Sequence, residues 1–382
     1  SLAAKSPNNI VHVILPQADP PEQRYLKAAE RFNRWIEEGA LAQDQEESYY
    51  LLEQRFFDSS RREHVRKALF AAVKIPEPGE QTVLGHERTF RHKIEDRLEL
   101  TRATRSNMGG IFVMYFDREH ALRKFLRQTD ARPADLRAET IDGVMLKLWR
   151  VPADPVVAEF FSEQTLYIAD GHHRFATAVA YRDEMRAKEQ PDGLRPYDYV
   201  LMGLVNFDDP GLLVYPAHRA LDPPESFALD DFLNSMSDWL TIRERQPDRL
   251  ERQVNEAEGC ALGLVTHSGA AHLFTLRADV DRKEFLPTSH GDAWQSLDVA
   301  VLHAGVLERC MGLEANAELV YEPDTDATLR LVRDGEKEMA FILKGATPDQ
   351  IKACADAGEF MPQKATYLFP KLPTGAVFHR LC

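Results

Sequence analysis

A run of five residues near the middle of the chain carries the side chains best suited to chemistry: Asp170, Gly171, His172, His173 and Arg174. Histidine and arginine donate hydrogen bonds to anions, and these bonds are strongest when the donor is charged. A carboxylate such as that of Asp170 can orient a donor or hold a metal ion. Glycine allows the backbone to approach a ligand closely. The run therefore predicts a site for a phosphate or a similar anion.

The elements on either side would place this run between a strand and a helix. Residues 165–169 are apolar and partly β-branched, which is typical of a buried strand. From Phe175 to about Lys188, apolar residues return with helical spacing. The first N–H groups of a helix lack internal partners and lie at the positive end of its dipole, so they favour an anion. The alternative is that Asp170 only caps the helix and that both histidines are solvated.

The composition is that of an ordinary globular protein with an acidic balance. The 382 residues are 44% hydrophobic and 28% charged, and the formal net charge is −14. Because phosphate backbones select basic surfaces, this charge argues against a general nucleic-acid binder. The four cysteines include no CxxC pair, so neither a zinc finger nor a disulfide framework is expected. With no signal peptide and no apolar run of about 18 residues, we expect a cytoplasmic protein without a membrane partner.

A second stretch, residues 85–105, is basic in a chain that is acidic as a whole. It holds six lysines and arginines against four acidic residues. Lys93 and Arg97 can share a helix face, with Asp96 beside them and Glu87 before them. Charge runs usually face water, so a solvated helix is the simpler interpretation. The alternative is that these residues contribute to the anion site.

Both stretches resemble patterns of a known family. The DGHHR run between strand and helix is similar to the phosphate-binding box of the ParB/sulfiredoxin superfamily, and the whole chain resembles the family called domain of unknown function 1015. A second pattern of that family is matched in order and spacing by His86-Glu87, Thr89, Lys93, Asp96-Arg97, Asn107 and Ile111-Phe112. Gly109-Gly110 stands where the family has Ser-Pro, which favours a more flexible loop.

Two later segments extend the resemblance. Residues 209–219 are similar to a third family pattern, and His218-Arg219 at its end would add phosphate contacts unless this is a plain surface loop. Residues 359–376 contain three prolines, so an extended, fixed segment is expected. Lys364 and Lys371 would reach phosphate from it, unless the segment only packs. The family has Lys-Ser-Thr where this chain has Lys364-Ala365-Thr366, so one hydroxyl is lost.

The resemblance implies an α+β (mixed α/β) fold in two parts. We place a ParB/sulfiredoxin-like nucleotide-binding core at residues 1–220, without the N-terminal part that the family pattern includes. Residues 221–382 would form a smaller α+β unit whose Lys/Pro-rich tail closes on the core. Within the core, residues 10–15 are predicted to form a strand, and 140–151 a hairpin around Asp142-Gly143.

These features together favour phosphoryl transfer. The sequence has no P-loop, no kinase-type HRD loop, no GxGxxG and no HExxH-type zinc spacing. The superfamily includes nucleotide hydrolases, an ATP-using sulfinyl reductase and kinases that act on free serine. The resemblance therefore implies an ATP- or ADP-dependent kinase with Mg²⁺ that phosphorylates a small hydroxyl compound, with free L-serine as the first candidate. A nucleotide-binding regulatory module, like the ParB switches, is the alternative, and a nuclease is disfavoured by the net charge.

Each candidate residue has a role in this prediction. Asp170 or Glu87 would orient the acceptor hydroxyl, Asp170 would also hold the metal, and His172 is grouped with them as catalytic. The predicted phosphate-binding residues are Gly171, His173, Arg174, Lys93, Arg97, His218, Arg219, Lys364 and Lys371. The expected partners are a nucleotide and a small-molecule substrate, with no nucleic acid and no membrane, and a homodimer is a further expectation.

Overall fold

The computed structural model describes residues 2–58, 60–314 and 317–382; positions 1 and 59 of the first predicted domain, and 315–316 of the second, lie outside the described residues. The chain divides into two compact units. The first combines Ser1–Leu212 with Pro370–Cys382, and the second is Leu213–Phe369. This division differs from the predicted domains, 1–220 and 221–382. Residues 213–220 belong to the second unit, and the last thirteen residues return to the first.

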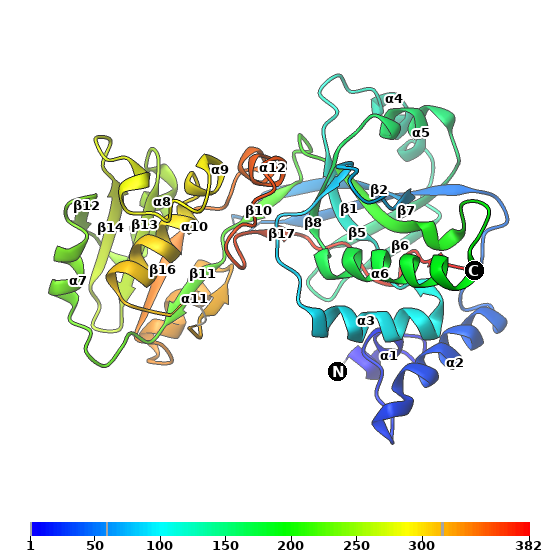
Figure 1. The fold of residues 1–382 in the computed structure, drawn as a ribbon, viewed down its shortest axis with the longest axis horizontal. Coiled ribbons are helices and arrows are strands. Elements are labelled where there is room, and N and C mark those ends of the chain that lie inside the picture. The colour runs from blue at the N-terminus through cyan, green and yellow to red at the C-terminus, as the bar shows by residue number, and fades with distance from the viewer. Residues whose placement is uncertain (1, 59, 315–316) are drawn as a thin grey trace. The chain divides into compact units, whose positions relative to one another are not determined.

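The first unit is built on one large sheet. Its elements are α1 Val11–Ile14, α2 Arg24–Glu37, β1 Ser48–Phe57, β2 Glu63–Lys74, β3 Val83–Leu84, α3 Arg91–Thr104, β4 Ser106–Asn107, β5 Ile111–Tyr115, α4 Arg123–Asp130, β6 Leu136–Glu139, β7 Met145–Pro152, α5 Pro155–Ser162, β8 Leu166–Asp170, α6 His172–Glu189, β9 Tyr199–Asn206 and β18 His379–Arg380 (Figure 1). Eight strands run in the order β3-β8-β5-β9-β2-β1-β7-β6. Parallel and antiparallel pairs are mixed, so the α+β fold class is confirmed.

Strand periodicity explains which side chains form the core of this unit. Alternate residues of β2, beginning with Leu69 and Ala71, lie on the face of the sheet that packs against Phe175 and Ala178 of α6. The even-numbered residues of β2, which include Arg66, lie on the opposite face of the sheet. Every residue of β5 is buried, as expected for a central strand that is covered on both faces. The buried strand predicted at residues 165–169 is confirmed, because β8 spans Leu166–Asp170 and its first four residues are buried.

The hairpin predicted around Asp142-Gly143 is also confirmed, because β6 and β7 pair across it and Gly143 has a φ of +79°. The strand predicted at residues 10–15 is wrong: Val11–Ile14 forms one helical turn, α1. Val13 in this turn is completely buried, in a cluster with Phe32 and Trp35 of α2. A short apolar run has no distinctive period, so packing against α2 decided its conformation.

The second unit contains an antiparallel sheet with its own core. Its elements are β10 Leu213–Tyr215, β11 His218–Leu221, α7 Leu229–Ser235, β12 Leu240–Glu244, α8 Pro247–Glu256, β13 Ala261–Thr266, β14 Ala271–Leu276, α9 Asp292–Gln295, α10 Asp298–Ala300, a π-helix Val301–Cys310, β15 Val320–Glu322, α11 Thr325–Arg333, β16 Met339–Leu343, α12 Pro348–Asp356 and β17 Tyr367–Phe369. Six strands run in the order β12-β14-β13-β16-β11-β15, and β10 pairs with β17. No helix among the described residues of the chain is long and apolar enough to cross a membrane.

The last thirteen residues are a structural part of the first unit. β18 pairs antiparallel with β4, and the Leu381 N–H donates to the Arg105 carbonyl at 2.9 Å. Leu381 is buried in a cluster with Leu98, Tyr181 and Tyr197. Residues 359–376 contain no helix, as their prolines predicted.

Candidate functional site

The predicted strand, turn and helix meet at Asp170. β8 ends at this residue, Gly171 adopts a φ of +100°, and α6 begins at His172, three residues earlier than predicted. A side chain at Gly171 would be strained at this φ, and its Cβ would lie 2.8 Å from Arg174 Nη2. The hydrogen bonds of α6 begin with the N–H of Phe175, which donates to the Gly171 carbonyl at 2.9 Å. The N–H groups of the first turn therefore lie where an anion is favoured.

Two cations share the Asp170 carboxylate. Arg174 Nη2 donates to Oδ2 at 2.7 Å, and Lys371 Nζ donates to Oδ1 at 2.7 Å. The three side chains are 35% to 42% exposed, so this group borders solvent. Burial acts to raise the pKa of the Asp170 carboxyl, but Lys371 and Arg174 outweigh burial, and the pKa is lowered. Asp170 is therefore an ionised centre between two cations. Arg174 Nη1 also donates to the Gly110 carbonyl at 2.6 Å.

His172 links the helix start to Glu87. The His86 N–H donates to His172 Nε2 at 3.2 Å, so Nε2 is the unprotonated nitrogen of a neutral ring. The proton must then be on Nδ1, which lies 3.3 Å from Glu87 Oε2. Because His172 is only 5% exposed, it holds the Glu87 carboxylate from a fixed, buried position. Glu87 also acts electrostatically on Asp170, which places both carboxylates in one cluster.

His173, the next residue of α6, contacts Phe90 in the segment that precedes α3. Its Nε2 accepts the Phe90 N–H at 3.1 Å, and its ring stacks on the Phe90 ring at a centroid distance of 5.8 Å. Lys93 Nζ lies 5.1 Å from the same Phe90 ring. Burial, followed by the Lys93 charge, lowers the pKa of His173. The two histidines therefore fasten residues 86–90 to the first turn of α6.

His86, between these contacts, is an unusual buried residue. It has no exposed surface, and its ring meets the His172 ring edge-on at 4.7 Å. Neither ring nitrogen makes a hydrogen bond in the described part of the chain, although the ring lies near the Ile168 backbone. Burial, with a smaller contribution from His172, lowers the pKa of His86 to about 3. A neutral His86 therefore packs behind the site.

The structure uses Arg97 differently from the prediction. Its Nε donates to Asp96 Oδ2 at 2.8 Å, and its Nη1 donates to the Ile14 carbonyl at 3.0 Å. Asp96 also accepts from the Tyr25 hydroxyl at 2.6 Å. These bonds connect α3 to α1 and α2, so the contacts of Arg97 are structural, whereas those of Lys93, one turn earlier, are with the site.

Three other predicted phosphate-binding residues belong to the second unit. His218 is buried in β11, where its Nε2 lies 2.9 Å from Thr325 Oγ1 and its Nδ1 accepts the Leu343 N–H at 3.2 Å. Arg219 is also buried and donates to His303 Nε2 at 3.1 Å and to the Lys364 carbonyl at 3.2 Å. His218, Arg219 and Lys364 therefore belong to a different compact unit from the Asp170 group.

Three contributors were not recognised in the sequence. The Gly110 carbonyl binds Arg174, and the loop before it is closely packed and not loose: a Cβ on Gly110 would lie 2.6 Å from the Phe70 ring. The signal for Gly110 was its glycine pair. Gln54 and Arg66 hold the chain at Pro370 and Lys371. Both stand beside charged residues in their strands, so residue type alone did not mark them.

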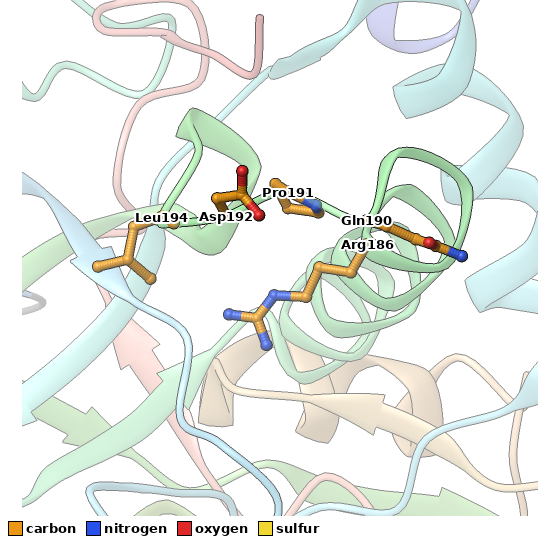
Figure 2. Close-up of a pocket in the computed structure, with 6 residues that line it drawn as sticks. Arg186, Gln190, Pro191, Asp192 and Leu194 are labelled. Carbon is orange, nitrogen blue, oxygen red and sulfur yellow. The ribbon is translucent and has the colours of Figure 1, made fainter.

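The other end of α6 has a hollow of about 590 Å³. Arg186 and residues 190–194 line it (Figure 2). Arg186 donates to Asp198 at 2.6 Å and to both Glu77 oxygens at 2.8 and 2.9 Å. Its charge is therefore already used by ion pairs within the fold.

The fold and the site define an α+β protein in which β8, a strand of a mixed sheet, ends at Asp170 and is followed directly by α6. The family model described as "Protein of unknown function (DUF1015)" matches residues 1–300, and the chain belongs to this family. The resemblance of the whole chain to domain of unknown function 1015, inferred from the sequence, is thereby confirmed. No curated protein matches the chain.

Several solved structures match this chain weakly. They include free serine kinase in complex with AMP, with a TM-score of 0.37, 14% identity, and 80% of this chain and 89% of that chain covered. A mutant of free serine kinase in complex with ADP has a TM-score of 0.40 and 14% identity, over 81% and 91%. SbnI with a C-terminal truncation, from Staphylococcus aureus, has a TM-score of 0.38 and 10% identity, over 80% and 83%. At these values the likeness says nothing about the activity of this chain.

Proposed function

We propose that this chain is a nucleotide-dependent phosphotransferase that acts on a small hydroxyl compound, with free L-serine as the first candidate. The proposal depends most on one observation: the Asp170 carboxylate lies between Arg174 and Lys371 at the start of α6, beside the Glu87–His172 pair. Phosphoryl transfer needs cations, oriented N–H groups and carboxylates in one place. We also propose that the first unit is a ParB/sulfiredoxin-like core, since the DGHHR run resembles that superfamily.

In the proposed binding step, the terminal phosphates of ATP or ADP become the partners of Arg174 and Lys371 in place of Asp170. Each charge-assisted hydrogen bond contributes about 1.5–3 kcal/mol. The start of α6 adds about 0.3–1 kcal/mol through its dipole. Because His173 Nε2 accepts from Phe90, its Nδ1–H is a further donor. Lys93 supplies positive charge near this ring.

In the proposed transfer step, the oxygen of the acceptor hydroxyl forms a bond to the terminal phosphorus. The bond between that phosphorus and the nucleotide oxygen breaks, and its electron pair leaves with the nucleotide. The hydroxyl proton moves to the Glu87 carboxylate, which His172 Nδ1 holds in place. Asp170, once its cations have turned to phosphate, orients the acceptor. Arg174 and Lys371 balance the charge that develops on the phosphoryl oxygens.

Mg²⁺ does not fit the residues as they are arranged. Both Asp170 oxygens accept from cations at 2.7 Å, and no group of three or more His, Cys, Asp or Glu side chains in the described part of the chain could hold a metal ion. The predicted metal role of Asp170 therefore receives no support from its surroundings. Mg²⁺ enters the proposal only as the ion that nucleotide phosphates carry in solution.

One observation favours a second candidate function, a nucleotide-binding regulatory module like the ParB switches. A carboxylate already neutralised by two cations is poorly placed to act on a substrate, although the same cations can still bind a phosphate. In this alternative, nucleotide binding exchanges the partners of Arg174 and Lys371, and no phosphoryl group is transferred.

A single experiment separates the candidates. The purified protein is incubated with ATP or ADP, with and without Mg²⁺, and with a panel of amino acids and sugars, and products are read by phosphorus NMR. A phosphorylated acceptor supports the phosphotransferase. Glu87→Gln should then abolish transfer but preserve nucleotide binding, whereas the control Glu99→Gln on α3 should change neither. Binding without transfer supports the regulatory module, and no binding at all contradicts both.

The proposal extends to partners and compartment. The chain carries a net charge of −14, and the two cations of the proposed site, Arg174 and Lys371, are both bound to Asp170. We therefore propose that the protein binds nucleotides and not nucleic acids, which select extended basic surfaces. All four cysteines are free thiols, which suits a reduced cytoplasm. A homodimer is proposed as the assembly, and sedimentation would test it.

A further inference from the structure

Two polar side chains, Gln54 and Arg66, are buried on the face of the large sheet opposite its apolar core. They are 1% and 0% exposed, and they are register partners on β1 and β2. Burial lowers the pKa of Arg66 to about 9, which still leaves it charged near neutral pH. A buried cation is costly, so its contacts should explain why it is there.

The contacts of this pair lead to the segment that carries Lys371. Arg66 Nη2 donates to the Gln54 Oε1 and to the Pro370 carbonyl, and its guanidinium lies 4.7 Å from the Phe112 ring centroid. Because arginine only donates, Gln54 must present its oxygen to Arg66. Its Nε2 is thereby aimed at the Lys371 carbonyl, to which it donates at 3.0 Å. Two successive carbonyls are therefore held by two side chains that orient each other.

The segment is also seated by close packing on its next residues. A Cβ on Gly203 of β9 would lie 2.4 Å from Leu372 Cδ1, so only glycine leaves room for Leu372 there. A Cβ on Gly109 would lie 3.3 Å from Thr374 Cγ2. Lys371 therefore extends toward Asp170 from a backbone fixed on both sides.

We propose that Gln54 and Arg66 are positioning residues that place the Lys371 ammonium at the Asp170 carboxylate. Arg66 makes no hydrogen bond through Nε or Nη1 in the described part of the chain. Its buried charge is therefore committed to orienting Gln54 and holding Pro370. Gln54 and Arg66 act on the anion site only through Lys371. Their effect on nucleotide binding therefore rests on the proposed function.

The decisive variant is Gln54→Glu, for which positioning and simple packing predict different results. The exchange keeps the volume, adds a carboxylate beside Arg66 to the existing charge of Asp209, and replaces the donor to the Lys371 carbonyl by an acceptor. If the pair only packs, the exchange is neutral or stabilising, because the buried cation gains an anion. If the pair positions Lys371, carbonyl and carboxylate repel each other and Lys371 leaves Asp170. The matched control is the reverse exchange one residue earlier, Glu53→Gln.

The first measurement does not depend on nucleotide binding. Lysines are reductively methylated with ¹³C-formaldehyde, and the signal of Lys371 is identified by its loss in Lys371→Met. Asp170→Asn should shift this signal because the ion pair is lost. Gln54→Glu should give the same shift, and Glu53→Gln should leave the signal in place. A signal at the parent position in Gln54→Glu overturns the proposal. Gln54→Met, which keeps the size and loses the donor, repeats the test if the glutamate variant does not fold.

The second measurement is ADP affinity in a double-mutant cycle. Lys371→Met and Gln54→Glu should each weaken binding about tenfold, and the double variant should be no weaker than either. Losses that multiply would mean that Gln54 acts by another route, which overturns the positioning role. If the parent protein does not bind ADP, the proposed function fails, while the NMR shift still decides the placement of Lys371.

Discussion

Replacing Asp170 by asparagine is expected to tighten nucleotide binding, which is the opposite of what the loss of a binding residue would do. Arg174 and Lys371 both bind the Asp170 carboxylate at 2.7 Å. A phosphate must compete with this carboxylate for the same two cations. Asparagine has the same shape and removes the negative charge, so both cations become available.

The size of the effect follows from the exposure of the ion pairs. Each pair involves side chains that are 35% to 42% exposed, so each is worth about 0.2–1 kcal/mol after screening by solvent. Releasing both therefore adds about 0.4–2 kcal/mol to phosphate binding, which corresponds to a gain of about twofold to thirtyfold in affinity. Turnover, where present, should fall at the same time, because the carboxylate that orients the acceptor is lost.

Calorimetry with ADP in about 0.15 M and 0.5 M salt measures this gain, which should shrink as salt screens the cations. Glu184→Gln is the control, because it removes one half-exposed carboxylate from the same helix, about 18 Å from the helix start. Unchanged or weaker ADP binding in Asp170→Asn would refute the competition between carboxylate and phosphate. It would favour the simpler interpretation in which Asp170 only fixes Arg174 and Lys371 within the fold.

Three further outcomes are expected. Gly171→Ala should destabilise the protein by about 1–3 kcal/mol in urea unfolding and weaken ADP binding, because its φ is +100° and the new Cβ would crowd Arg174; unchanged values would show that the turn relaxes. Removal of residues 370–382 should unfold the first unit, seen as lost hydrogen-exchange protection of its strands, and a folded truncated protein would contradict this. Burial, and to a smaller extent the charge of Arg219, lowers the pKa of His303 to about 3. In the unfolded chain the same side chain takes up its proton near pH 6.5. The stability that neutral His303 contributes is therefore complete above pH 6.5 and is lost as the pH falls toward 3. His303→Gln should make stability depend less on pH in this window, by up to about 1.4 kcal/mol per pH unit, and an unchanged slope would contradict the assignment.

Local patterns were enough to predict the elements of the site but not all of its contacts. The strand before Asp170 and the helix after it were read from apolar periodicity, and both are present. The earlier helix start was missed because it depends on the left-handed conformation of Gly171, which glycine permits without requiring it. This difference moves His172 and His173 from a loop into the first helical turn.

Long-range contacts were beyond sequence patterns. Lys371 was expected among phosphate-binding residues, but its contact with Asp170 joins positions 201 residues apart. Arg97 and Lys93 lie one helical turn apart and looked equivalent, yet Arg97 is bound to Asp96 and to the Ile14 carbonyl. Arg219 was predicted to contact phosphate but is buried in β11 against His303. Tertiary partners, not residue type, separated these arginines from the site.

The discontinuous first unit has a consequence for biosynthesis. Residues 213–369 are translated between β9 and the segment that completes this unit, which takes roughly 8 to 30 seconds at ordinary ribosome speeds. During that interval the buried Arg66 lacks its Pro370 partner and Gly203 lacks the cover of Leu372. The nascent first unit must therefore wait in an unfinished form until Lys371, a cation of the proposed anion site, has been translated. Chains that terminate early would leave this sheet face open to chaperones and proteases.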